Sequence, residues 1–385
     1  MNAGDLQGAG IATRAIHAGE GIDPHTHAHN VPIYQTATFA YDTAEALESE
    51  VDRVLAREPD GFVYTRAGNP TNDALERKVA DLEGAEASLV CASGMAALAT
   101  AILSVLDAGD HCVVPEDIYM GTGILVDDVL ASKGVGVTRV DTTDLAAVES
   151  AIGPRTKALL VESVSNPHML FSDVEDLAGL AHANGSVLIV DNTFLSPVLF
   201  RPLELGADFV VHSATKYMSG HGDAIAGAIS GRSELVNRAH HYQEVIGGAS
   251  SPFNSWLVLR DVHTLPLRMR VHSENALELA RFFEGHEAVE WVRYIGLASH
   301  PQHALAQRCL PQGYGGMLTL RLNGGQAEMS AFSRAVKLGV VAVSLGDVKT
   351  LVNPMPSHNQ IVRVSVGCED VEDLLEDFGS ALASV

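Results

Sequence analysis

Several features that mark other classes of protein are missing from this sequence or rare in it. The 385 residues include 25 lysines and arginines against 48 acidic residues, so the formal net charge is −23. A surface this acidic repels a nucleic-acid backbone and an anionic lipid leaflet, and we expect neither as a partner. No stretch reaches the roughly 18 uninterrupted apolar residues of a membrane-spanning helix, so we expect no membrane span.

Cysteine is also scarce. The four cysteines show no C-x-x-C spacing, and several lie in apolar runs: Cys91, Cys112, Cys309 and Cys368. This usage is typical of reduced core residues and not of a disulfide framework. The first residues lack the basic and apolar regions of a secretory signal peptide. Together these absences predict a cytoplasmic protein.

What the chain does contain is typical of a large globular protein. Hydrophobic residues make up 46% and charged residues 19%, close to globular averages, and the length suits two or three packed domains. Residues 1–60 hold few strand signals and several Gly and Pro breakers, which predicts an N-terminal arm with one helix, from Thr43 to about Arg57. We predict a large domain at residues 61–250 and a C-terminal α+β domain at residues 251–385.

In the predicted large domain, short apolar runs alternate with segments of helical periodicity. This alternation predicts crossover units, and hence an α/β fold with a mostly parallel sheet buried on both faces. The apolar runs are Ser88–Cys91, His111–Val114, Val135–Val140, Ala158–Val161, Val187–Val190, Phe209–Val211 and Ile225–Ile229.

The predicted elements of the C-terminal domain follow a different pattern. It opens with a long helical stretch from Pro252 to about Glu284, in which Pro266 predicts a kink or a boundary. Strand-like and helix-like segments then alternate, at Met317–Leu322, Gln326–Lys337, Ile361–Val366 and Val371–Leu382.

The ends of the predicted strands carry the candidate site, because ligands bind beyond the carboxyl ends of the strands in open parallel sheets. Asp191 follows one strand, and Lys216 follows another within a Ser-Ala-Thr-Lys segment. The segment Ser93–Ala97 follows a third strand and opens an apolar helix. Its small residues leave backbone N–H groups free at a helix N-terminus, which favours phosphate binding.

An amine, a carboxylate and a phosphate-binding helix end are the three groups that pyridoxal phosphate requires. Each also has a simpler interpretation: Lys216 as a solvated surface lysine, Asp191 as a helix cap or ribose ligand, and Ser93–Ala97 as a common turn. On this pattern alone, a nucleotide site and a metal site stay open as alternatives. A Rossmann site competes poorly, since no G-x-G-x-x-G lies at a strand–helix junction, and no Walker A motif is present.

Histidines in the arm are a further metal candidate. His25, His27 and His29 alternate along residues 25–29, but no matching cluster of ligands is evident in the sequence. A solvated or subunit-contacting loop explains them more simply, and we expect no metal site.

With these residues in place, the sequence resembles the Cys/Met-metabolism family of pyridoxal-phosphate-dependent enzymes. This family includes cystathionine gamma-synthase, cystathionine gamma-lyase, methionine gamma-lyase and the O-acylhomoserine sulfhydrylases. The resemblance covers nearly the whole chain, and its motifs are Tyr64-Thr65-Arg66-Ala67-Gly68-Asn69-Pro70-Thr71, Ser93-Gly94-Met95-Ala96-Ala97, Asp191-Asn192-Thr193-Phe194 and Ser213-Ala214-Thr215-Lys216-Tyr217.

The resemblance implies pyridoxal 5'-phosphate as cofactor and the fold of the fold-type-I transferases. It implies Lys216 as the Schiff-base lysine and Asp191 as the partner of the ring nitrogen. Tyr119 is implied as the residue that stacks on the ring and as an acid/base near the leaving group, and Asn166 as a contact of the ring hydroxyl. Four residues are implied as the phosphate site: Gly94, Met95, Ser213 and Thr215.

The resemblance also implies an assembly and a substrate site. It implies a homotetramer built from two tight dimers, in which the N-terminal arm contacts the neighbouring subunit. Tyr64 and Arg66 would reach the phosphate of that neighbour, so that active sites are shared. Ser344 and Arg363 would bind the α-carboxylate of a small amino-acid substrate.

The chain departs from the family pattern at several places. Met120 stands where many members have Gly, and Lys349 stands where cystathionine gamma-lyases usually carry Glu and sulfhydrylases often carry Lys. The segment Pro354–His358 is altered and the loop after it is almost absent, and Asp261–Leu265 replaces the commoner Gly-Leu-Lys-Thr-Leu. From these departures we expect an altered, more open substrate entrance.

The expected activity is γ-carbon chemistry on a sulfur-containing or O-activated homoserine-type amino acid. We place γ-elimination first, giving a 2-oxo acid, ammonia and a thiol, because the chain start and Val343–Asp347 resemble the lyases. Lys349 favours the alternative, γ-replacement of the cystathionine gamma-synthase or sulfhydrylase type. A non-catalytic paralogue is a lesser alternative. Four intact residues argue against it: Lys216, Asp191, Tyr119 and Arg363.

Overall fold

Two β-sheets organise the chain in the computed structural model, which describes residue 6 and residues 8–385. The larger sheet has seven strands in the order β1-β7-β6-β5-β4-β2-β3. Only β7 runs against the others, since it pairs antiparallel with both β1 and β6 while the remaining pairs are parallel. The strands are β1 (Ala87–Cys91), β2 (His111–Pro115), β3 (Gly136–Val140), β4 (Thr156–Glu162), β5 (Val187–Asp191), β6 (Phe209–His212) and β7 (Gly227–Gly231).

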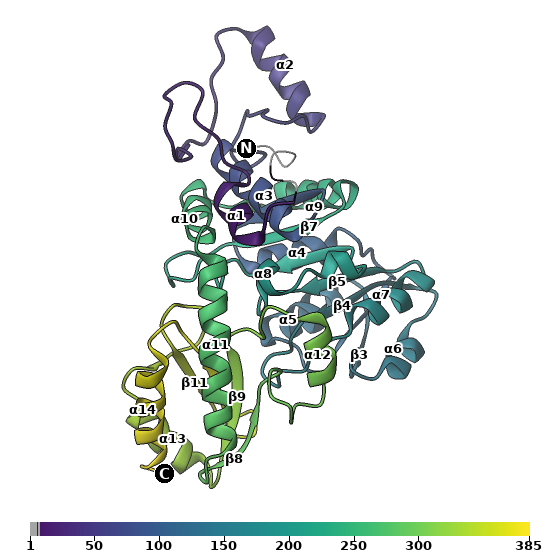
Figure 1. The fold of residues 1–385 in the computed structure, drawn as a ribbon. Helices are drawn as coiled ribbons and strands as arrows, with labels where there is room; N and C mark the ends of the chain where they lie inside the picture. The colour runs from purple at the N-terminus through teal and green to yellow at the C-terminus, as the bar shows by residue number, and fades with distance from the viewer. Residues whose placement is uncertain (1–5, 7) are drawn as a thin grey trace.

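Helices cover both faces of this sheet, because its strands are apolar on both sides. In β4, Leu159 and Val161 join one core cluster, while Ala158 and Leu160 join the cluster on the opposite face, as the alternation of strand side chains requires. The first face is covered by α3 (Pro70–Glu83), α6 (Leu145–Ala151) and α7 (Val174–Ala183). The second face is covered by α4 (Gly94–Leu103) and α9 (Ser233–Ile246). The predicted α/β class with a mostly parallel sheet is confirmed (Figure 1).

Shorter helical segments link these elements. They are α5 (Met120–Ile124), the π-helix η2 (Leu125–Leu130), α8 (Ser196–Leu199) and the 3₁₀-helix η3 (Pro202–Leu205).

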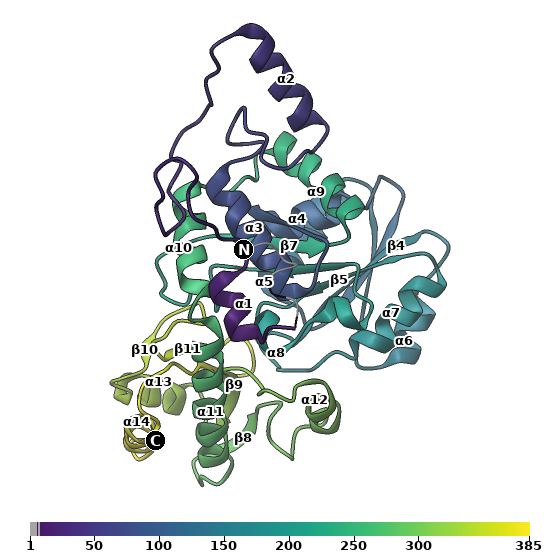
Figure 2. The ribbon, with the colours of Figure 1, turned by 45° about the horizontal axis from the view of Figure 1, so that its top comes forward.

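The N-terminal region contains two helices, where the sequence analysis expected one. The expected helix is α2 (Ala44–Leu55), which begins where the Thr43 hydroxyl accepts a hydrogen bond from the Ala46 N–H, and it buries no residue within the chain. The additional helix, α1 (Ile11–His17), packs on α3 and α11, with Ala15 fully buried and Arg14 paired with Asp81 at 2.9 Å. The helical pattern of α1 was missed because seven residues are too few to show a period. Figures 1 and 2 show α2 projecting from the body and α1 lying against it.

The C-terminal part begins with two consecutive helices, α10 (Pro252–Val262) and α11 (Leu265–Glu284). The predicted boundary at Pro266 is therefore confirmed: Pro266 lies in the first turn of α11, where its missing N–H costs no hydrogen bond. A five-stranded sheet of order β10-β11-β12-β9-β8 follows. The remaining elements are β8 (Val289–Arg293), α12 (His303–Cys309), β9 (Met317–Leu322), α13 (Gln326–Ala335), β10 (Val340–Val341), β11 (Leu351–Met355), β12 (Ile361–Ser365) and α14 (Val371–Leu382).

A third core cluster lies between this sheet and α11, α13 and α14, with Phe283, Phe332 and Phe378 among its fully buried side chains. The sequence analysis did not expect β8, β10 or β11. In β11, Pro354 argues against a strand, but β10 pairs only with Leu351 and Val352. Pro354 therefore lies where β11 is an edge strand and needs no N–H on that side.

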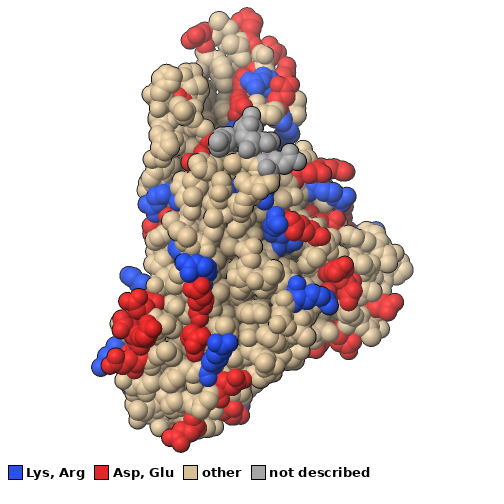
Figure 3. Space-filling model, in the orientation of Figure 1, with Lys and Arg blue, Asp and Glu red and all other residues tan. Residues whose placement is uncertain are grey.

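One face of the molecule is mixed in charge. On the face drawn in Figure 3, Lys and Arg side chains lie singly or in small groups beside acidic ones. Among the described residues, no helix is both long and apolar enough to cross a membrane.

Candidate active site

The carboxyl ends of neighbouring strands bring several predicted site residues to one edge of the large sheet. Glu162 at the end of β4 is in register with Asp191 at the end of β5, and Asp191 is in register with Val211 of β6. The turn that carries Lys216 follows β6 directly. The parallel pairing thus places segments that are distant in the sequence at one site.

Asp191 offers one carboxylate oxygen to a ligand. Its Oδ1 accepts hydrogen bonds from the Thr193 N–H at 3.0 Å and from the Thr193 hydroxyl at 2.5 Å, while its Oδ2 makes no hydrogen bond with any described residue. Burial raises the pKa of Asp191, and the bonds from Thr193 and the nearby His212 oppose this shift. A protonated ring nitrogen facing Oδ2 would offset the cost of the buried charge.

Lys216 is a largely buried amine. Its Nζ donates a hydrogen bond to Ser344 Oγ at 2.8 Å, and it forms no ion pair with the acidic groups that the structure describes. Burial, followed by the charge of Arg363, lowers the pKa of Lys216. Both effects favour the neutral amine, which is the form that attacks an aldehyde.

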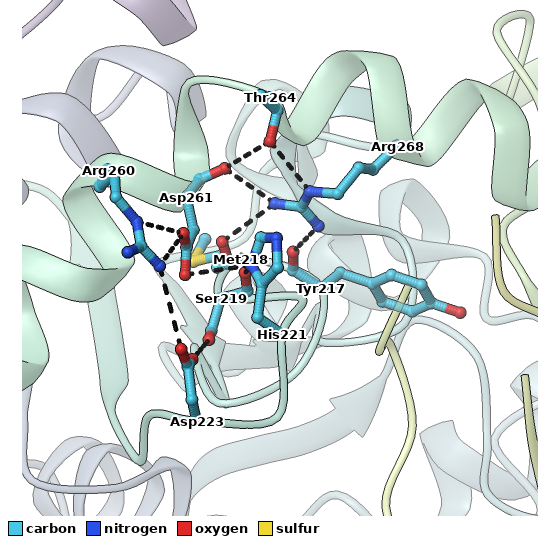
Figure 4. A network of polar contacts seen from close by, with 9 residues as sticks. All are labelled: Tyr217, Met218, Ser219, His221, Asp223, Arg260, Asp261, Thr264 and Arg268. Carbon is cyan, nitrogen blue, oxygen red and sulfur yellow. Dashed lines mark hydrogen bonds and ion pairs between the residues drawn. The ribbon is translucent and has the colours of Figure 1, made fainter. Parts of the chain in front are cut away.

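Arg268 of α11 forms hydrogen bonds to the backbone of the turn that follows Lys216 (Figure 4). The Arg268 guanidinium donates to the carbonyl oxygens of Tyr217 at 2.6 Å and Met218 at 3.3 Å. It is anchored by the Asp261 carbonyl at 2.9 Å and the Thr264 hydroxyl at 3.2 Å. Arg268 is 7% exposed, so this fork is a buried support for the lysine turn.

Gly220 completes the turn, with a φ of +74°, and a Cβ at this position would lie 2.2 Å from Arg268 Nη1. Only glycine combines this backbone with so close an approach. The Gly220 N–H donates to the Lys216 carbonyl at 2.7 Å, which closes the turn on the lysine itself.

Asp261 is one of the departures from the family pattern, and it lies behind the lysine turn. Its carboxylate is paired with Arg260 at 2.8 Å and lies 3.3 Å from His221 (Figure 4). The Asp261 carboxylate ties α10 to the loop that follows Lys216. The expectation that this segment alters the substrate entrance stays a prediction.

The N-terminus of α4 forms the candidate phosphate site. Ser93 caps the helix by accepting from the Ala96 N–H at 3.0 Å, and the N–H groups of Gly94 and Met95 have no hydrogen-bond partner among the described residues. A Cβ on Gly94 would lie 2.5 Å from Ser213 Cβ, so Ser213 is adjacent to this helix end. Thr215 is nearby in sequence, but its hydroxyl is already bonded to the Ala226 backbone at 3.0 Å and 3.1 Å.

Arg363 and Asn166 lie together beside Lys216. The Arg363 guanidinium donates to Asn166 Oδ1 at 3.0 Å and to the Ser344 carbonyl at 2.8 Å, and its Nε is buried with no partner. Burial lowers the pKa of Arg363, and none of the described acids pairs with it. A buried, unpaired guanidinium fits a carboxylate ligand.

Ser344 is held in an unusual backbone conformation next to this guanidinium. Its φ is +94°, a region that a serine rarely adopts. The following Gly346 packs directly on the lysine turn, since a Cβ there would lie 2.6 Å from the Tyr217 nitrogen. The strained segment thus brings the Ser344 hydroxyl to Lys216.

Tyr119 lies at the open side of the site and is 43% exposed. A Cβ on Gly121 would lie 2.6 Å from the Tyr119 ring and 3.1 Å from Met95 Sδ, so the ring lies close to the N-terminus of α4. The Tyr119 N–H donates to Glu162 Oε1 at 2.8 Å.

Tyr64 and Arg66 do not lie beside the other predicted site residues of the same chain. Tyr64 is 46% exposed, and Arg66 lies over its ring at 5.6 Å while donating to the Glu244 carbonyl at 3.0 Å. Within the described chain, neither contacts Lys216, Asp191 or Arg363.

Two residues of the site were missed by sequence reasoning. Glu162 directly follows the predicted strand Ala158–Val161, which was a positional signal, but no motif assigned it a role. Arg268 lies inside a helix 52 positions after Lys216, and no local pattern could have linked the two.

The buried amine, the half-free carboxylate and the open helix end fit pyridoxal phosphate, and together with the fold they define a pyridoxal-phosphate-dependent enzyme. A model of the family described as "Cys/Met metabolism PLP-dependent enzyme" matches residues 12–383. The chain belongs to this family, as the sequence resemblance predicted, and the predicted cofactor and enzyme class are confirmed.

Similar proteins cover almost the full length. The chain is 39% identical to L-methionine gamma-lyase of Treponema denticola, over 99% of both sequences. It is 40% identical to cystathionine gamma-synthase of Mycobacterium leprae, over 97% of both. The crystal structure of metB from Corynebacterium glutamicum superposes with a TM-score of 0.92 at 37% identity, covering 98% of this chain and 99% of the other, which agrees with the predicted fold-type-I architecture.

Proposed function

We propose that this enzyme acts at the γ-carbon of a sulfur-containing or O-activated homoserine-type amino acid, chiefly by γ-elimination. A sulfur-containing substrate and water would give a 2-oxo acid, ammonia and a thiol. The observation that carries the proposal is the placement of Arg363 and Lys216 on the two sides of Ser344. An amino acid held there by its carboxylate would present its α-carbon to an amine.

The cofactor, when bound, supplies a ring that withdraws electrons from the substrate α-carbon. Lys216 is the residue that would bind it covalently, and Asp191 would face its ring nitrogen through Oδ2. The phosphate would be held by the α4 N–H groups and nearby hydroxyls, that is by Gly94, Met95, Ser213 and Thr215. Asn166 would contact the ring hydroxyl with its side chain.

The other roles follow from the positions of the side chains. Arg363, with Ser344, would orient the substrate by its carboxylate. Lys216 Nζ, as a neutral amine beside it, would accept the α-proton and move a proton at the neighbouring carbon. Tyr119, exposed at the open side, would stack on the cofactor and protonate the leaving group at its hydroxyl.

We further propose that active sites are shared within a homotetramer built from tight dimers. Tyr64 and Arg66 would complete the phosphate site of a neighbouring subunit. Their exposure supports this, as does helix α2 of the arm, which buries nothing within its own chain. The four free cysteines, two of them fully buried, support a reducing compartment such as the cytoplasm.

γ-Replacement is the second candidate. Lys349 is exposed, as a residue that meets a second substrate would be, and lyases and synthases resemble the chain equally well, at 39% and 40% identity.

The test is an assay of methionine, cystathionine and O-acetylhomoserine, each with and without an added thiol. Release of a 2-oxo acid without thiol supports elimination. If product forms only when a thiol is added, the reaction is γ-replacement and not elimination. No reaction of any substrate in protein that carries the cofactor overturns both.

A further inference from the structure

Glu162 is a buried carboxylate that none of the roles above uses. It ends β4 and is 7% exposed. Its Oε1 accepts from the Tyr119 N–H at 2.8 Å and its Oε2 accepts from the Asn166 N–H at 3.1 Å. One side chain therefore joins the loop after β2 to the loop after β4.

The surroundings of Glu162 make this buried acid unfavourable for the stability of the fold. Burial, followed by the charges of Asp191 and Asp117, raises the pKa of Glu162 well above its usual range, and its two N–H donors do not cancel this shift. None of the described lysines, arginines or histidines forms an ion pair with it. A buried acid without a cation lowers stability, so general stabilisation of the fold does not account for it.

The contacts of Glu162 continue to the substrate side of the site. Asn166, whose N–H it holds, accepts from Arg363 at 3.0 Å through its side chain. Arg363 donates to the Ser344 carbonyl at 2.8 Å, and the Ser344 hydroxyl accepts from Lys216 at 2.8 Å. A continuous set of hydrogen bonds thus runs from the backbone of Tyr119 through Glu162 to the lysine.

We propose that Glu162 is a positioning residue, which holds the backbone of Tyr119 and that of Asn166 at one fixed separation. It would thereby keep the ring-stacking side chain aligned with the carboxylate-binding arginine. The catalytic consequence rests on the proposed function of these residues, but the physical claim concerns only two backbone N–H groups and one carboxylate.

The variant Glu162→Gln tests the physical claim directly. Glutamine has one acceptor oxygen, and its NH₂ group cannot accept from the second N–H, so one of the two loops loses its bond. Glu162→Asp keeps both acceptors but is shorter by one methylene. It is the second variant, in case the first does not fold.

Glu76→Gln is a matched control. Glu76 of α3 is a half-buried carboxylate that also accepts a backbone N–H, from Val90 at 2.9 Å, and its pKa is raised to about 8. It contacts none of the proposed site residues among those the structure describes.

The measurement is amide hydrogen exchange of the full-length protein with its cofactor, read in peptides that contain Tyr119 and Asn166. We expect exchange at one or both amides to rise by about fivefold to tenfold in Glu162→Gln, as for one lost hydrogen bond, and to stay unchanged in Glu76→Gln. Unchanged exchange at both amides in Glu162→Gln and Glu162→Asp overturns the proposal. So does an equal rise at these amides in Glu76→Gln.

Steady-state kinetics then separate the catalytic consequence from the proposed function. We expect Glu162→Gln to lower kcat more than it raises KM, with Glu76→Gln like the wild type. Equal kcat in Glu162→Gln and wild type would overturn the alignment role. An inactive wild-type enzyme with the expected exchange pattern would instead overturn the proposed function and leave the contact intact.

Discussion

The two sides of Lys216 are built differently. On the buried side, Asp191, Arg268 and Arg363 are held by hydrogen bonds within the chain. On the open side, Tyr64 and Tyr119 are 46% and 43% exposed, and the side-chain contacts of Tyr64 stay within its own loop. One chain therefore positions its amine and carboxylate groups by itself, whereas the side chains of the open side remain accessible to a partner.

Removing the amine of Lys216 should have the largest effect. Lys216→Ala deletes the group that bonds to Ser344. We expect turnover to fall by at least about a thousandfold, since the proposed function gives this amine both the covalent link to the cofactor and the role of proton acceptor. Turnover and cofactor absorbance measure this change. A variant that keeps more than a tenth of wild-type turnover would contradict it, and Lys349→Ala is the exposed lysine control.

Arg363→Ala tests the substrate half of the buried side. We expect KM to rise by about ten- to a hundredfold, because hydrogen bonds to a charged carboxylate are lost. Arg363→Lys should restore only part of this affinity, as an ammonium lacks the guanidinium fork. Steady-state kinetics check both variants; an unaltered KM in Arg363→Ala would place the carboxylate elsewhere.

The open side is tested by mixing two inactive variants, Arg66→Ala and Lys216→Ala. If sites are shared, subunits that reassort at random should recover about a quarter of wild-type activity, because half of the dimers are mixed and each has one intact site. The activity is followed after co-refolding or co-expression. Recovery no higher than the average of the parents would mean that Arg66 serves its own chain.

Arg268→Lys probes the support behind the lysine turn. We expect the free energy of unfolding to fall by about 2–4 kcal/mol, because a buried fork that donates to three carbonyl groups and one hydroxyl is replaced by an ammonium. Arg270→Lys on the same helix is the control, since Arg270 forms an exposed pair with Glu274 at 3.1 Å and should change stability little. Denaturant unfolding measures both; equal effects would show that the Arg268 bonds do not support the turn.

A smaller effect concerns how the stability of the fold depends on pH through Glu76 of α3. Burial, followed by the charge of Asp73, raises the pKa of Glu76 to about 8 from 4.5. The folded state therefore binds more protons than the unfolded state between these values, so this residue's contribution to stability declines as the pH rises from about 4.5 to 8.

We expect Glu76→Gln to flatten the loss of stability over this range, as measured by unfolding at a series of pH values. Glu274→Gln, at an exposed position, is the control and should leave the profile unchanged. An identical profile in Glu76→Gln would show that Glu76 is ionised throughout.

Much of the large domain could be predicted because its signals are local. The apolar run before Asp191, the small residues at Ser93–Ala97 and the helical spacing of α7 each lie within a few residues. The C-terminal sheet was harder: β10 has two residues and β11 contains Pro354, so neither shows a strand pattern of useful length. The two-residue pairing of β10 with β11 exists only because the chain folds back there.

The sequence by itself determined the α/β alternation, the family and the presence of an amine, an acid and a helix end at strand termini. Tertiary structure alone decided which distant groups meet: Lys216 and Ser344 are 128 positions apart, and Arg363 and Asn166 are 197 apart. It also decided that Glu162 bridges two loops and that Arg268 supports the lysine turn. The physical reason is that periodicity and turn chemistry act over a few neighbouring residues, whereas these contacts depend on how whole layers pack.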